Sequence, residues 1–502
     1  MREWSASETR SAVARGSVSA AEVTRSSLER IAASQPALNA FTEVFEDRAM
    51  ARAEAIDARL ASGEPIEAIG PLAGVPVAVK DNLCTAFGRT TCASRMLEAY
   101  RSPFSATAVE RLEAAGAVIV GKTNLDEFAM GSSGEHSAFG PTRNPWDTSR
   151  VPGGSSSGSA AAVAAGLVPV ALGSDTGGSI RQPAALTGTV GLKPTYGTVS
   201  RWGLVAFGSS LDQIGPIART VEDAALVFDA VSGRDARDST CLDRDPARTR
   251  AVLGLPLDGL RVAVPSQARD DAIDGGVRLV FGLTLRAFED LGAELVDIEL
   301  PSAEEMLAAY YTVAPAEASS NLARYDGVRY GRRADLPEGA PLSDLYTRSR
   351  SEGFGSEVKR RILLGTHVLR AGYADRYYLR ALKMRRLIRS DYDAVFSVMG
   401  CDAVLTPTTA GPAFALGSKL GAGVDPMAMY HEDLFTVGAN LAGLPAVSLP
   451  AGFVPVDGLS LPVGVQLTGP ALGEAVLMRV ARAFEGVSGA AGRVAPEAAP
   501  AV

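Results

Sequence analysis

The chain has 502 residues and a formal net charge of −8, with 46% hydrophobic and 21% charged residues. This composition is ordinary for a large globular protein with a substantial core. The acidic balance argues against a protein that grips a nucleic-acid backbone over a broad basic face, although local basic patches remain possible.

The cysteines and the N-terminal residues bear on the cellular compartment in which the protein is expected. The four cysteines have no metal-ligand spacing, and the charged N-terminus lacks the apolar segment of a signal peptide. The longest apolar run, 160–173, is too short to span a bilayer. We therefore expect a cytoplasmic protein with reduced thiols and no membrane contact. The cysteines are Cys84, Cys92, Cys241 and Cys401.

The first part of the chain predicts helices around short buried strands. Residues 5–35 have the apolar periodicity of two amphipathic helices, with Ser19 as the N-cap of the second. The apolar run 75–79 predicts a strand that delivers Lys80. Further elements are predicted as helices over about 46–62, 105–115 and 159–166, and as strands at 117–120 and 168–172.

The second half of the chain continues the alternation of strands and helices. Strands are predicted at 261–264, 294–300, 403–406 and 446–449, and helices over 273–292, 303–323, 355–371 and 373–397. Such alternation is typical of an α/β layer structure.

Composition also predicts the domain organisation. The charged stretch 233–250 is expected to be a surface excursion; it could divide two lobes, but the alternation resumes after it. We therefore predict one domain with a continuous sheet over 1–485, which begins with the helices of about 1–62. The segment 486–502, rich in Ala, Gly and Pro, has little to bury and is expected to be a flexible tail.

The most informative segment is 151–183, in which two glycine-serine clusters, 153–158 and 177–179, flank a small, apolar run. Without Cβ atoms, successive backbone N–H groups can converge on one point and stabilise developing negative charge. Flexible linkers are also rich in Gly and Ser, but a long uncharged apolar run does not normally follow them. The clusters therefore predict backbone folded around a small reacting group.

Two patterns match other motifs by letter only. Residues 116–123 match the phosphate-loop pattern GxxxxGK[ST], but β-branched strand residues fill the place where the motif needs a loop. Residues 154–158 match the GxSxG nucleophile elbow, but a loop precedes them where that motif needs an apolar strand. We therefore reject nucleotide binding at 116–123 and keep a Ser-His-Asp enzyme only as a minor alternative.

The chain offers few bases for a serine nucleophile. Of its three histidines, His367 lies on an apolar helix face and is expected to pack in the core, whereas His431 precedes an acidic pair and is expected to be exposed; the third is His136. Lys80 can serve instead if burial lowers its pKa enough to leave it neutral. A solvated lysine at a strand end is the alternative.

At this point the sequence resembles the amidase signature enzymes over most of its length. The resemblance implies an α/β fold with one large twisted mixed β-sheet covered by helices on both faces. It also implies a Ser–cis-Ser–Lys triad, with Ser179 as nucleophile, Ser155 as relay and Lys80 as base. The motifs that carry it are specific in combination: GVPVAVKDN at 74–82, PGGSSSGSAAAVAAG at 152–166, GSDTGGSIRQPA at 173–184 and SLDQIGPIART at 210–220.

The resemblance further implies the local geometry of the site. The peptide bond between Gly154 and Ser155 is expected to be cis. Arg181 and Asp212 are expected to brace the site rather than to react. The oxyanion hole is expected to use the backbone N–H groups of Thr176, Gly177, Gly178 and Ser179. We expect the neighbouring hydroxyls to cap the following helix or to bond locally, namely those of Ser156, Ser157 and Ser159.

Within the family, the chain most closely resembles the A subunits of bacterial or organellar amidotransferases that act on Glu-tRNA(Gln) or Asp-tRNA(Asn). The resemblance implies glutamine as the substrate, with Arg361 on the α-carboxylate and Asp433 on the α-ammonium. Tyr310 is a further polar contact, and Tyr311 is its close rival. From the residues alone, Arg361 would be interpreted as a solvated helix residue and Asp433 as half of a surface pair. The segments concerned are 90–100, 124–133, 314–331, 352–366 and 440–450.

The same resemblance implies partners. Ammonia would pass through a tunnel to a B subunit that binds tRNA, ATP and Mg²⁺, while a small C subunit wraps the A–B junction. This chain would hold no cofactor or metal of its own and would meet tRNA mainly through the B subunit. The complex would be an ATP-dependent carbon–nitrogen ligase that makes Gln-tRNA(Gln), Asn-tRNA(Asn) or both.

Two other functions remain open from the sequence. One is a stand-alone amidase that uses the same triad on small amides. The other is a non-catalytic interaction protein within a complex, against which the intact Lys80, Ser155 and Ser179 argue.

Overall fold

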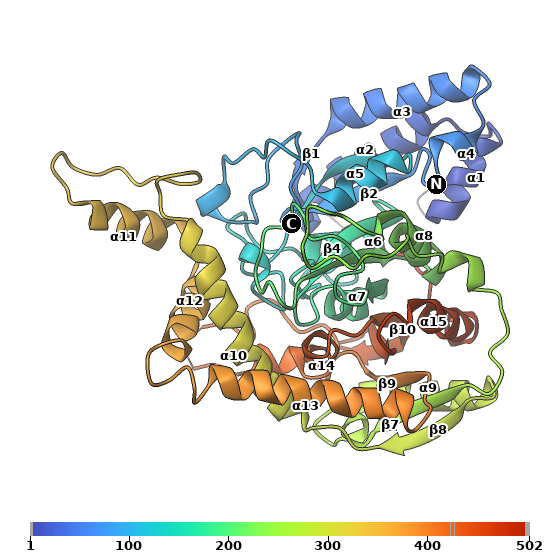
Figure 1. Cartoon of the computed structure of the whole chain (residues 1–502). Coiled ribbons are helices and arrows are strands. Elements are labelled where there is room, and N and C mark those ends of the chain that lie inside the picture. Colours follow the sequence, from blue (N-terminus) through green and yellow to red (C-terminus); the bar gives the residue numbers. More distant parts are fainter. Residues whose placement is uncertain (1–3, 422, 426, 497–502) are drawn as a thin grey trace.

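One mixed sheet forms the centre of the computed structural model, which describes residues 4–421, 423–425 and 427–496 (Figure 1). Within these residues the sheet has 11 strands, and helices cover both of its faces, so the predicted α/β class and continuous sheet are confirmed. The strands lie in the order β1 (Phe41–Val44), β3 (Val118–Thr123), β2 (Pro76–Lys80), β4 (Val170–Asp175), β6 (Gln213–Ala218), β5 (Val190–Lys193), β10 (Ala446–Val456), β11 (Leu459–Thr468), β9 (Ala403–Pro407), β7 (Arg261–Pro265) and β8 (Glu294–Ile298).

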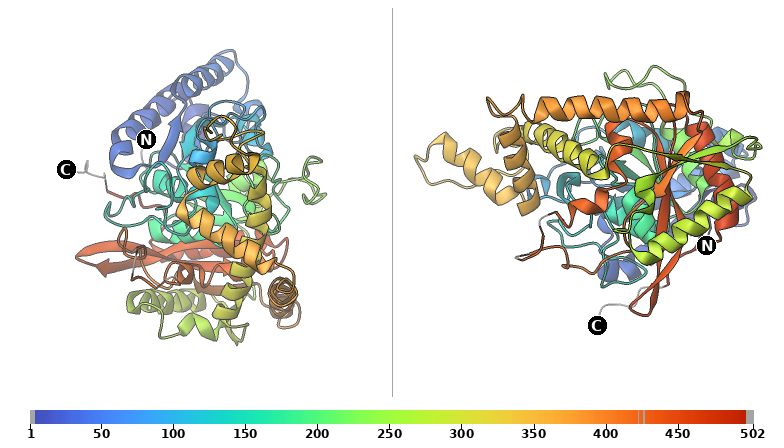
Figure 2. Two further views of the ribbon diagram at one scale, coloured as in Figure 1. Left: turned by 90° about the vertical axis from the view of Figure 1, so that its left-hand side faces the viewer. Right: turned by 90° about the horizontal axis from the view of Figure 1, so that it is seen from below.

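The sheet has parallel strands on either side of an antiparallel middle, and its edge strand β1 pairs antiparallel with β3. Strands β3, β2 and β4 are parallel neighbours, as are β9, β7 and β8, whereas β6, β5, β10 and β11 pair antiparallel. The parallel strands are short apolar runs, and the sequence predicts all of them. Of the strands that it does not predict, β5, β6 and β11 contain glycine, proline or glutamine within the run, which obscures the strand pattern, and β1 has only four residues. Beyond its neighbours, the β10–β11 pair extends as a two-stranded ribbon (Figure 2).

Each face of the sheet is covered by its own helices. One apolar core is continuous along the first face, beneath the helices α5 (Thr107–Ala114), α8 (Val221–Val231), α9 (Gly275–Asp290) and α15 (Glu474–Ser488). The second face carries two clusters. The first lies beneath α2 (Ala20–Leu38), α3 (Glu46–Ala61) and α6 (Ser157–Ala164), and the other beneath α10 (Ala303–Asn321), α12 (Ser356–Val368), α13 (Tyr378–Ser397) and α14 (Val437–Leu441). The short helix α7 (Arg181–Thr187) packs between them.

Helix α7 approaches the sheet closely because glycines face it. A Cβ atom on Gly191 or on Gly464 would lie 2.8 Å from a side-chain atom of α7. The N-terminal end of α7 follows directly on the second glycine-serine cluster. The close packing therefore holds this cluster against the ends of the central strands.

Helix boundaries follow the predictions with local differences. Ser19 is the N-cap of α2, as predicted, because its hydroxyl accepts the Glu22 N–H. The helix predicted over 373–397 begins only at Tyr378. His367 is exposed on the outer side of α12, against the predicted core position, and lies beside the Tyr373 ring. His431 is exposed, as predicted. No helix in the described part of the chain is long and apolar enough to cross a membrane.

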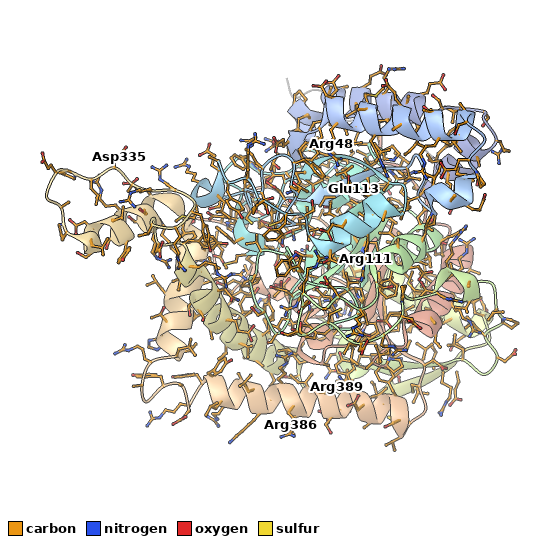
Figure 3. All side chains as sticks on the ribbon, turned by 45° about the horizontal axis from the view of Figure 1, so that its top comes forward. Arg48, Arg111, Glu113, Asp335, Arg386 and Arg389 are labelled. Atoms are coloured by element: carbon orange, nitrogen blue, oxygen red, sulfur yellow. The ribbon has the colours of Figure 1, made fainter. Side chains whose placement is uncertain are left out.

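Two segments lie at the periphery. Residues 233–249 form no helix or strand and run over the surface. The segment around α11 (Leu342–Gly353) projects from the body, with Asp335 near its tip (Figure 3). On α13, Arg386 points outward, whereas Arg389 donates to the Ala442 carbonyl at 2.9 Å. The remaining α-helices of the described residues are α1 (Ala6–Ala14) and α4 (Ile66–Ile69).

The chain end differs from the flexible tail expected from residue 486. Helix α15 continues to Ser488, and Ala495 is fully buried with its N–H donated to the Ala164 carbonyl at 2.9 Å. Small side chains allow this close packing along α6. Residues 497–502 lie outside the described residues.

Candidate active site

Lys80 ends β2 at the centre of a buried group of serine hydroxyls. Its side chain is fully buried, and Nζ lies 2.7 Å from Ser155 Oγ, 2.9 Å from Ser156 Oγ and 3.0 Å from Ser174 Oγ. It also donates to the Ser174 carbonyl at 3.2 Å. None of the ion pairs among the described residues involves Lys80, in contrast to the buried Lys122, which pairs with Asp81 at 3.0 Å.

This environment disfavours the charged form of Lys80. Burial lowers the pKa of Lys80 to about 7, and the more distant carboxylates of Asp126, Asp175 and Asp212 offset the burial only in part. A large fraction of the amine is therefore neutral near pH 7. A neutral amine can accept the Ser155 hydroxyl proton across the same 2.7 Å contact.

Ser155 and Ser156 lie in a tight loop that precedes α6. The Gly154–Ser155 peptide bond is cis, as expected. A Cβ atom on Gly154 would lie 2.0 Å from Oδ2 of Asp126, and Gly153 has a φ of +86°, so the loop requires both glycines. The run of glycine and serine is thus explained by close backbone approach rather than by flexibility.

The serines after Ser155 neither cap α6 nor bond locally, contrary to the expectation. The N-cap Ser156 makes no side-chain cap and instead bonds Lys80, while it also donates to the Ser174 carbonyl at 3.1 Å. Ser157 contacts the Thr142 hydroxyl at 3.2 Å, and Ser159 the Thr123 hydroxyl at 2.7 Å. These hydroxyls join α6 to neighbouring segments because the helix is buried and water cannot satisfy them.

Ser179 lies on the loop between β4 and α7. Its residue is 7% exposed, whereas Lys80 and Ser155 are wholly buried. The Ser156 N–H donates to the Ser179 carbonyl at 3.1 Å, which holds the two serine segments together. Among the described residues, the Ser179 hydroxyl forms no hydrogen bond, so the Ser155–Ser179 contact of a complete relay is not made in this structure.

The backbone donors of the loop differ in availability. The Gly178 N–H already donates to the Asp175 carboxylate at 2.9 Å, which contradicts its expected place in an oxyanion hole. Within the described structure the N–H groups of Thr176, Gly177 and Ser179 have no acceptor. Tyr310 lies against this loop, since a Cβ atom on Gly177 would be 2.6 Å from its hydroxyl oxygen.

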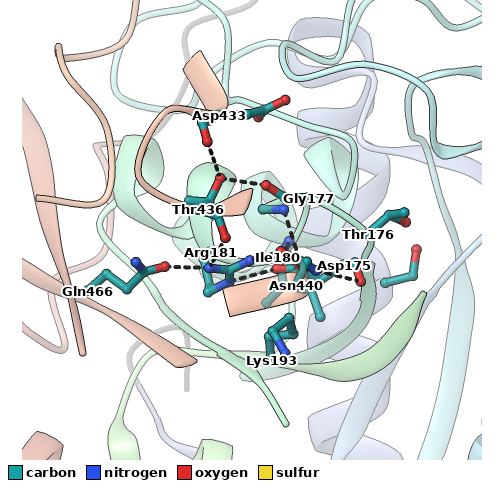
Figure 4. Close-up of polar contacts among 12 residues, drawn as sticks. Asp175, Thr176, Gly177, Ile180, Arg181, Lys193, Asp433, Thr436, Asn440 and Gln466 are labelled. Carbon is teal, nitrogen blue, oxygen red and sulfur yellow. Dashed lines mark hydrogen bonds and ion pairs between the residues drawn. The ribbon is translucent and has the colours of Figure 1, made fainter. Parts of the chain in front are cut away.

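A network of buried polar groups braces the loop from behind (Figure 4). Arg181 bonds both carboxylate oxygens of Asp175 at 3.0 Å, and it also donates to the Thr436 carbonyl at 2.9 Å. Burial alone would raise the pKa of Asp175, but Arg181 outweighs it and holds the pKa at about 2. Thr436 donates its hydroxyl to the Gly177 carbonyl at 2.5 Å. Arg181 therefore positions the loop and does not face the reacting groups.

Asp212 braces the same loop from its other end. Its Oδ1 accepts the Thr176 hydroxyl at 2.7 Å, and its carboxylate also accepts the N–H groups of Phe207 and Gly208 at 2.9 and 3.0 Å. Burial raises the pKa of Asp212 to about 6. Asp212 thus anchors the residue that begins the loop.

The two candidate tyrosines occupy different places beside the loop. Whereas Tyr310 contacts Gly177, the Tyr311 hydroxyl donates to Asp433 Oδ2 at 2.7 Å. The Ser132 hydroxyl lies 2.9 Å from each oxygen of Asp433. Asp433 is 5% exposed, and burial raises its pKa to about 7. It is therefore not a surface group, and its carboxylate is already oriented by two hydroxyls.

Arg361 is the cation of this region. It is 2% exposed, its Nε donates to Glu357 at 2.8 Å, and its guanidinium lies over the rings of Phe207, Tyr311 and Tyr430. Burial works against the charge, but Glu357 outweighs it and raises the pKa of Arg361. A buried, permanent cation within reach of aromatic rings is suited to bind a carboxylate.

The rejected motifs are also accounted for. Lys122, in the phosphate-loop pattern, is part of β3, donates to the Leu83 carbonyl at 2.7 Å and pairs with Asp81. None of the three histidines hydrogen-bonds a serine of the site within the described structure. The side chains that remain at the site thus leave Lys80 as the available base.

Several groups of the site were not predicted from the sequence. Ser156 and Ser174 share the Lys80 amine, while Ser132, Thr436 and Gln182 hold the segments around it. The signal for Ser156 and Ser174 was present, because both lie in or beside the glycine-serine clusters, but short polar residues there were expected to bond locally. In the described part of the chain, no group of three or more His, Cys, Asp or Glu side chains is arranged to hold a metal ion.

A cavity of about 610 Å³ lies next to the arginine region. Glu357 and the nearby Arg360 line it, together with His136 and Lys419 from two other segments. Because Glu357 also pairs with Arg361, the cavity borders the Arg361–Glu357 ion pair at the edge of the site.

Comparison with known proteins identifies the family to which the chain is similar. The family model described as Amidase matches residues 22–478. A protein from Carboxydothermus hydrogenoformans, described as the A subunit of glutamyl-tRNA(Gln) amidotransferase, is 55% identical over 468 residues, which are 93% of this chain and 94% of that relative. The protein of the same description from Symbiobacterium thermophilum is 54% identical over 473 residues, or 94% of each chain.

Solved structures agree. The crystal structure of the A subunit of glutamyl-tRNA(Gln) amidotransferase from Thermotoga maritima superposes with a TM-score of 0.79 at 42% identity, covering 100% of this chain and 98% of that one. The native peptide amidase from Stenotrophomonas maltophilia superposes with a TM-score of 0.81 at 33% identity, covering 99% of both chains.

Proposed function

The chain belongs to the amidase family, and we propose that it is the glutamine-hydrolysing subunit of a tRNA-dependent amidotransferase. It would cleave the side-chain amide of glutamine and supply ammonia for the conversion of Glu-tRNA(Gln), Asp-tRNA(Asn) or both. The similarity to subunits of this description over 93% of the chain supports the proposal. The buried polar groups beside the serine site support it independently.

The reaction begins with proton transfer to the neutral amine. Lys80 takes the proton of Ser155, which takes that of Ser179 as the Ser179 oxygen attacks the amide carbon. The Lys80–Ser155 contact of 2.7 Å serves the first transfer. The second requires the Ser179 hydroxyl to turn towards Ser155, and the bond between Ser156 N–H and the Ser179 carbonyl keeps their segments adjacent.

The tetrahedral oxyanion is stabilised by backbone donors. The N–H groups of Thr176, Gly177 and Ser179 are available for this role, and each donor of this kind contributes roughly 3–4 kcal/mol. The proton returns through Ser155 to the departing nitrogen, which leaves as ammonia. Water then releases glutamate from the acyl-enzyme on Ser179 by the same proton path.

The remaining buried charges suit a free amino acid. Arg361 would bind the α-carboxylate and Asp433 the α-ammonium, because both ions need partners when they are buried. Tyr310 lies against the oxyanion loop and Tyr311 orients Asp433, so the two tyrosines have separate tasks. A simple amide lacks both groups that Arg361 and Asp433 would bind.

The proposal assigns the other steps to partners. A B subunit would bind tRNA, ATP and Mg²⁺ and receive the ammonia through a tunnel, and a C subunit would stabilise the A–B junction. This chain would then need no cofactor or metal. The complex would work in the cytoplasm, where aminoacyl-tRNA is made, with the four cysteines of this chain unpaired as they are here.

The observation that carries the proposal is the buried Lys80 amine, without an ion-pair partner among the described residues, within hydrogen-bond distance of Ser155. The test measures ammonia released from glutamine by the chain, alone and together with its B and C subunits, ATP and Glu-tRNA(Gln). Ser179→Ala should abolish glutaminase activity while the circular-dichroism spectrum and the assembly of the complex stay unchanged. Wild-type activity in this variant would refute the mechanism. Efficient cleavage of simple amides without any activity on glutamine would instead favour a stand-alone amidase.

A further inference from the structure

The side chain of Gln182 bridges two segments of the site. Gln182 is the third residue after Ser179 and lies at the start of α7, with its side chain fully buried. Its Oε1 accepts the Gly154 N–H at 2.9 Å, and its Nε2 donates to the Ser132 carbonyl at 2.8 Å. The opposite orientation of the amide would set donor against donor and acceptor against acceptor, so both contacts define one orientation.

Each partner of Gln182 adjoins a functional group. Gly154 precedes Ser155, which contacts Lys80. Ser132 holds Asp433 through its hydroxyl at 2.9 Å from each carboxylate oxygen. The Gln182 amide therefore connects the segment of the relay serine, Ser155, with the segment that orients Asp433. Asp433 and Ser132 are called the amino-group site here, because Asp433 is the proposed partner of the α-ammonium.

The loop leaves little room for a substitute. A Cβ atom on Gly153 would lie 2.4 Å from the Gln182 Oε1, so the backbone of the serine loop packs directly on the amide. Both backbone groups that the amide bonds are buried, and a buried backbone donor or acceptor without a partner is costly. Loss of the amide should therefore move these segments to new partners.

We propose that Gln182 is a positioning residue that holds the relay serine and the amino-group site at the relative positions that glutamine requires. The inference rests on the proposed function, because it takes Asp433 as the group that binds the α-ammonium. The Oε1 contact orients the Gly154–Ser155 segment and acts on the chemical step. The Nε2 contact holds the Ser132 segment and acts on recognition of the amino group.

This division predicts different effects on two substrates. Glutaramate has the side-chain amide and the carboxylate of glutamine but lacks the α-ammonium, so it uses the relay without the amino-group site. In Gln182→Met, kcat should fall about 10- to 100-fold for both substrates, since displacements near 1 Å cost that much. The KM of glutamine should also rise several-fold, on the order of the effect of one lost polar contact, while the KM of glutaramate stays unchanged.

Gln213 offers a matched control. It is equally buried, and its amide likewise accepts one backbone N–H, from Gly197 at 2.9 Å, and donates to one backbone carbonyl, of Val199 at 3.1 Å. Gln213→Met should lower the free energy of unfolding to a similar extent and leave kcat for both substrates near the wild-type value. A purely structural effect would lower kcat equally in the two variants.

A conservative variant keeps the inference testable if Gln182→Met does not fold. In Gln182→Glu, a neutral carboxyl group can accept from Gly154 and donate to Ser132, whereas the ionised group cannot donate. The kcat of this variant relative to wild type should therefore fall as pH rises from about 6 to about 9.

The outcomes separate the two hypotheses. All assays use the chain assembled with its partner subunits, and wild-type ammonia release from glutamine is measured first; its absence refutes the proposed function itself. With wild-type activity present, an unchanged kcat in Gln182→Met, or an equal KM change for glutamine and glutaramate, overturns the inference alone. A pH-independent ratio for Gln182→Glu does the same.

Discussion

Replacing Lys80 with methionine tests whether a neutral amine lies at the centre of the site. Methionine has a similar length and no charge, and Lys80 is buried without an ion-pair partner among the described residues. Burial lowers the pKa of Lys80 from 10.5 to about 7. Between these two values the unfolded chain binds a proton that the folded chain does not.

The sign of the effect follows from this difference. Because the folded pKa is lowered, burial of Lys80 costs stability, and the cost is greatest below pH 7 and vanishes above the unfolded pKa. The full cost is about 5 kcal/mol, since one pKa unit corresponds to about 1.4 kcal/mol. From pH 7 to pH 9, wild type should gain about 2 kcal/mol relative to Lys80→Met.

Urea denaturation of both proteins at pH 7, 8 and 9 measures this gain. The serine hydroxyls that lose the amine cost roughly 1–3 kcal/mol each if unsatisfied, but this offset does not depend on pH and leaves the trend intact. Lys193→Met provides a comparison, because Lys193 is also buried and burial lowers its pKa to about 7. Wild type should show a similar gain in the free energy of unfolding relative to Lys193→Met between pH 7 and pH 9. Parallel stability curves for wild type and Lys80→Met would refute the reasoning.

Other predictions concern activity and the fold. In a plot of log(kcat/KM) for glutamine against pH, the value should fall below pH 7 with a limiting slope of up to two, because Lys80 must be neutral and Asp433 ionised, and the pKa of each is about 7. In Asp433→Asn this slope should drop to one and the KM of glutamine should rise at least about 10-fold. If neither change occurs, Asp433 does not bind the ammonium. Thr436→Val removes the hydroxyl that donates to the Gly177 carbonyl. It should lower kcat about 10-fold with little change in KM, which is less than the roughly 10²–10³-fold loss on removing an oxyanion donor, because the loop is displaced but keeps its donors. Steady-state kinetics with equal effects on both constants would contradict this role. Lys122→Met should destabilise the fold by about 3–5 kcal/mol, since it leaves Asp81 buried and unpaired; a stability in urea equal to wild type would contradict the assignment.

Much of the architecture was predictable because its signals are local. Parallel strands such as β2 and β4 are buried on both faces and appear as continuous apolar runs. The position of Lys80 at the end of such a run, and the two glycine-serine clusters, also follow from neighbouring residues. The resemblance to a known family then assigned roles to Ser155 and Ser179 that composition alone could not assign.

The antiparallel middle of the sheet was less predictable. Strands β5 and β6 contain glycine at positions where α7 or the neighbouring backbone approaches closely, as at Gly191 and Gly215. A glycine selected for such an approach weakens the local strand pattern. The reason for the residue lies in an element distant in the sequence, so a window of neighbouring residues does not reveal it.

The sequence by itself determined the alternation of strands and helices, the buried strand that delivers Lys80 and the residue types available for catalysis. Only the tertiary structure decided which hydroxyls share the amine, that Asp175 occupies the Gly178 N–H, and that Arg361 and Asp433 are buried. The contacts that orient Asp433 join residues 122 and 301 positions apart in the chain. Hydrogen bonds and desolvation depend on distances in space, and these arise only when the sheet and its helices have packed together.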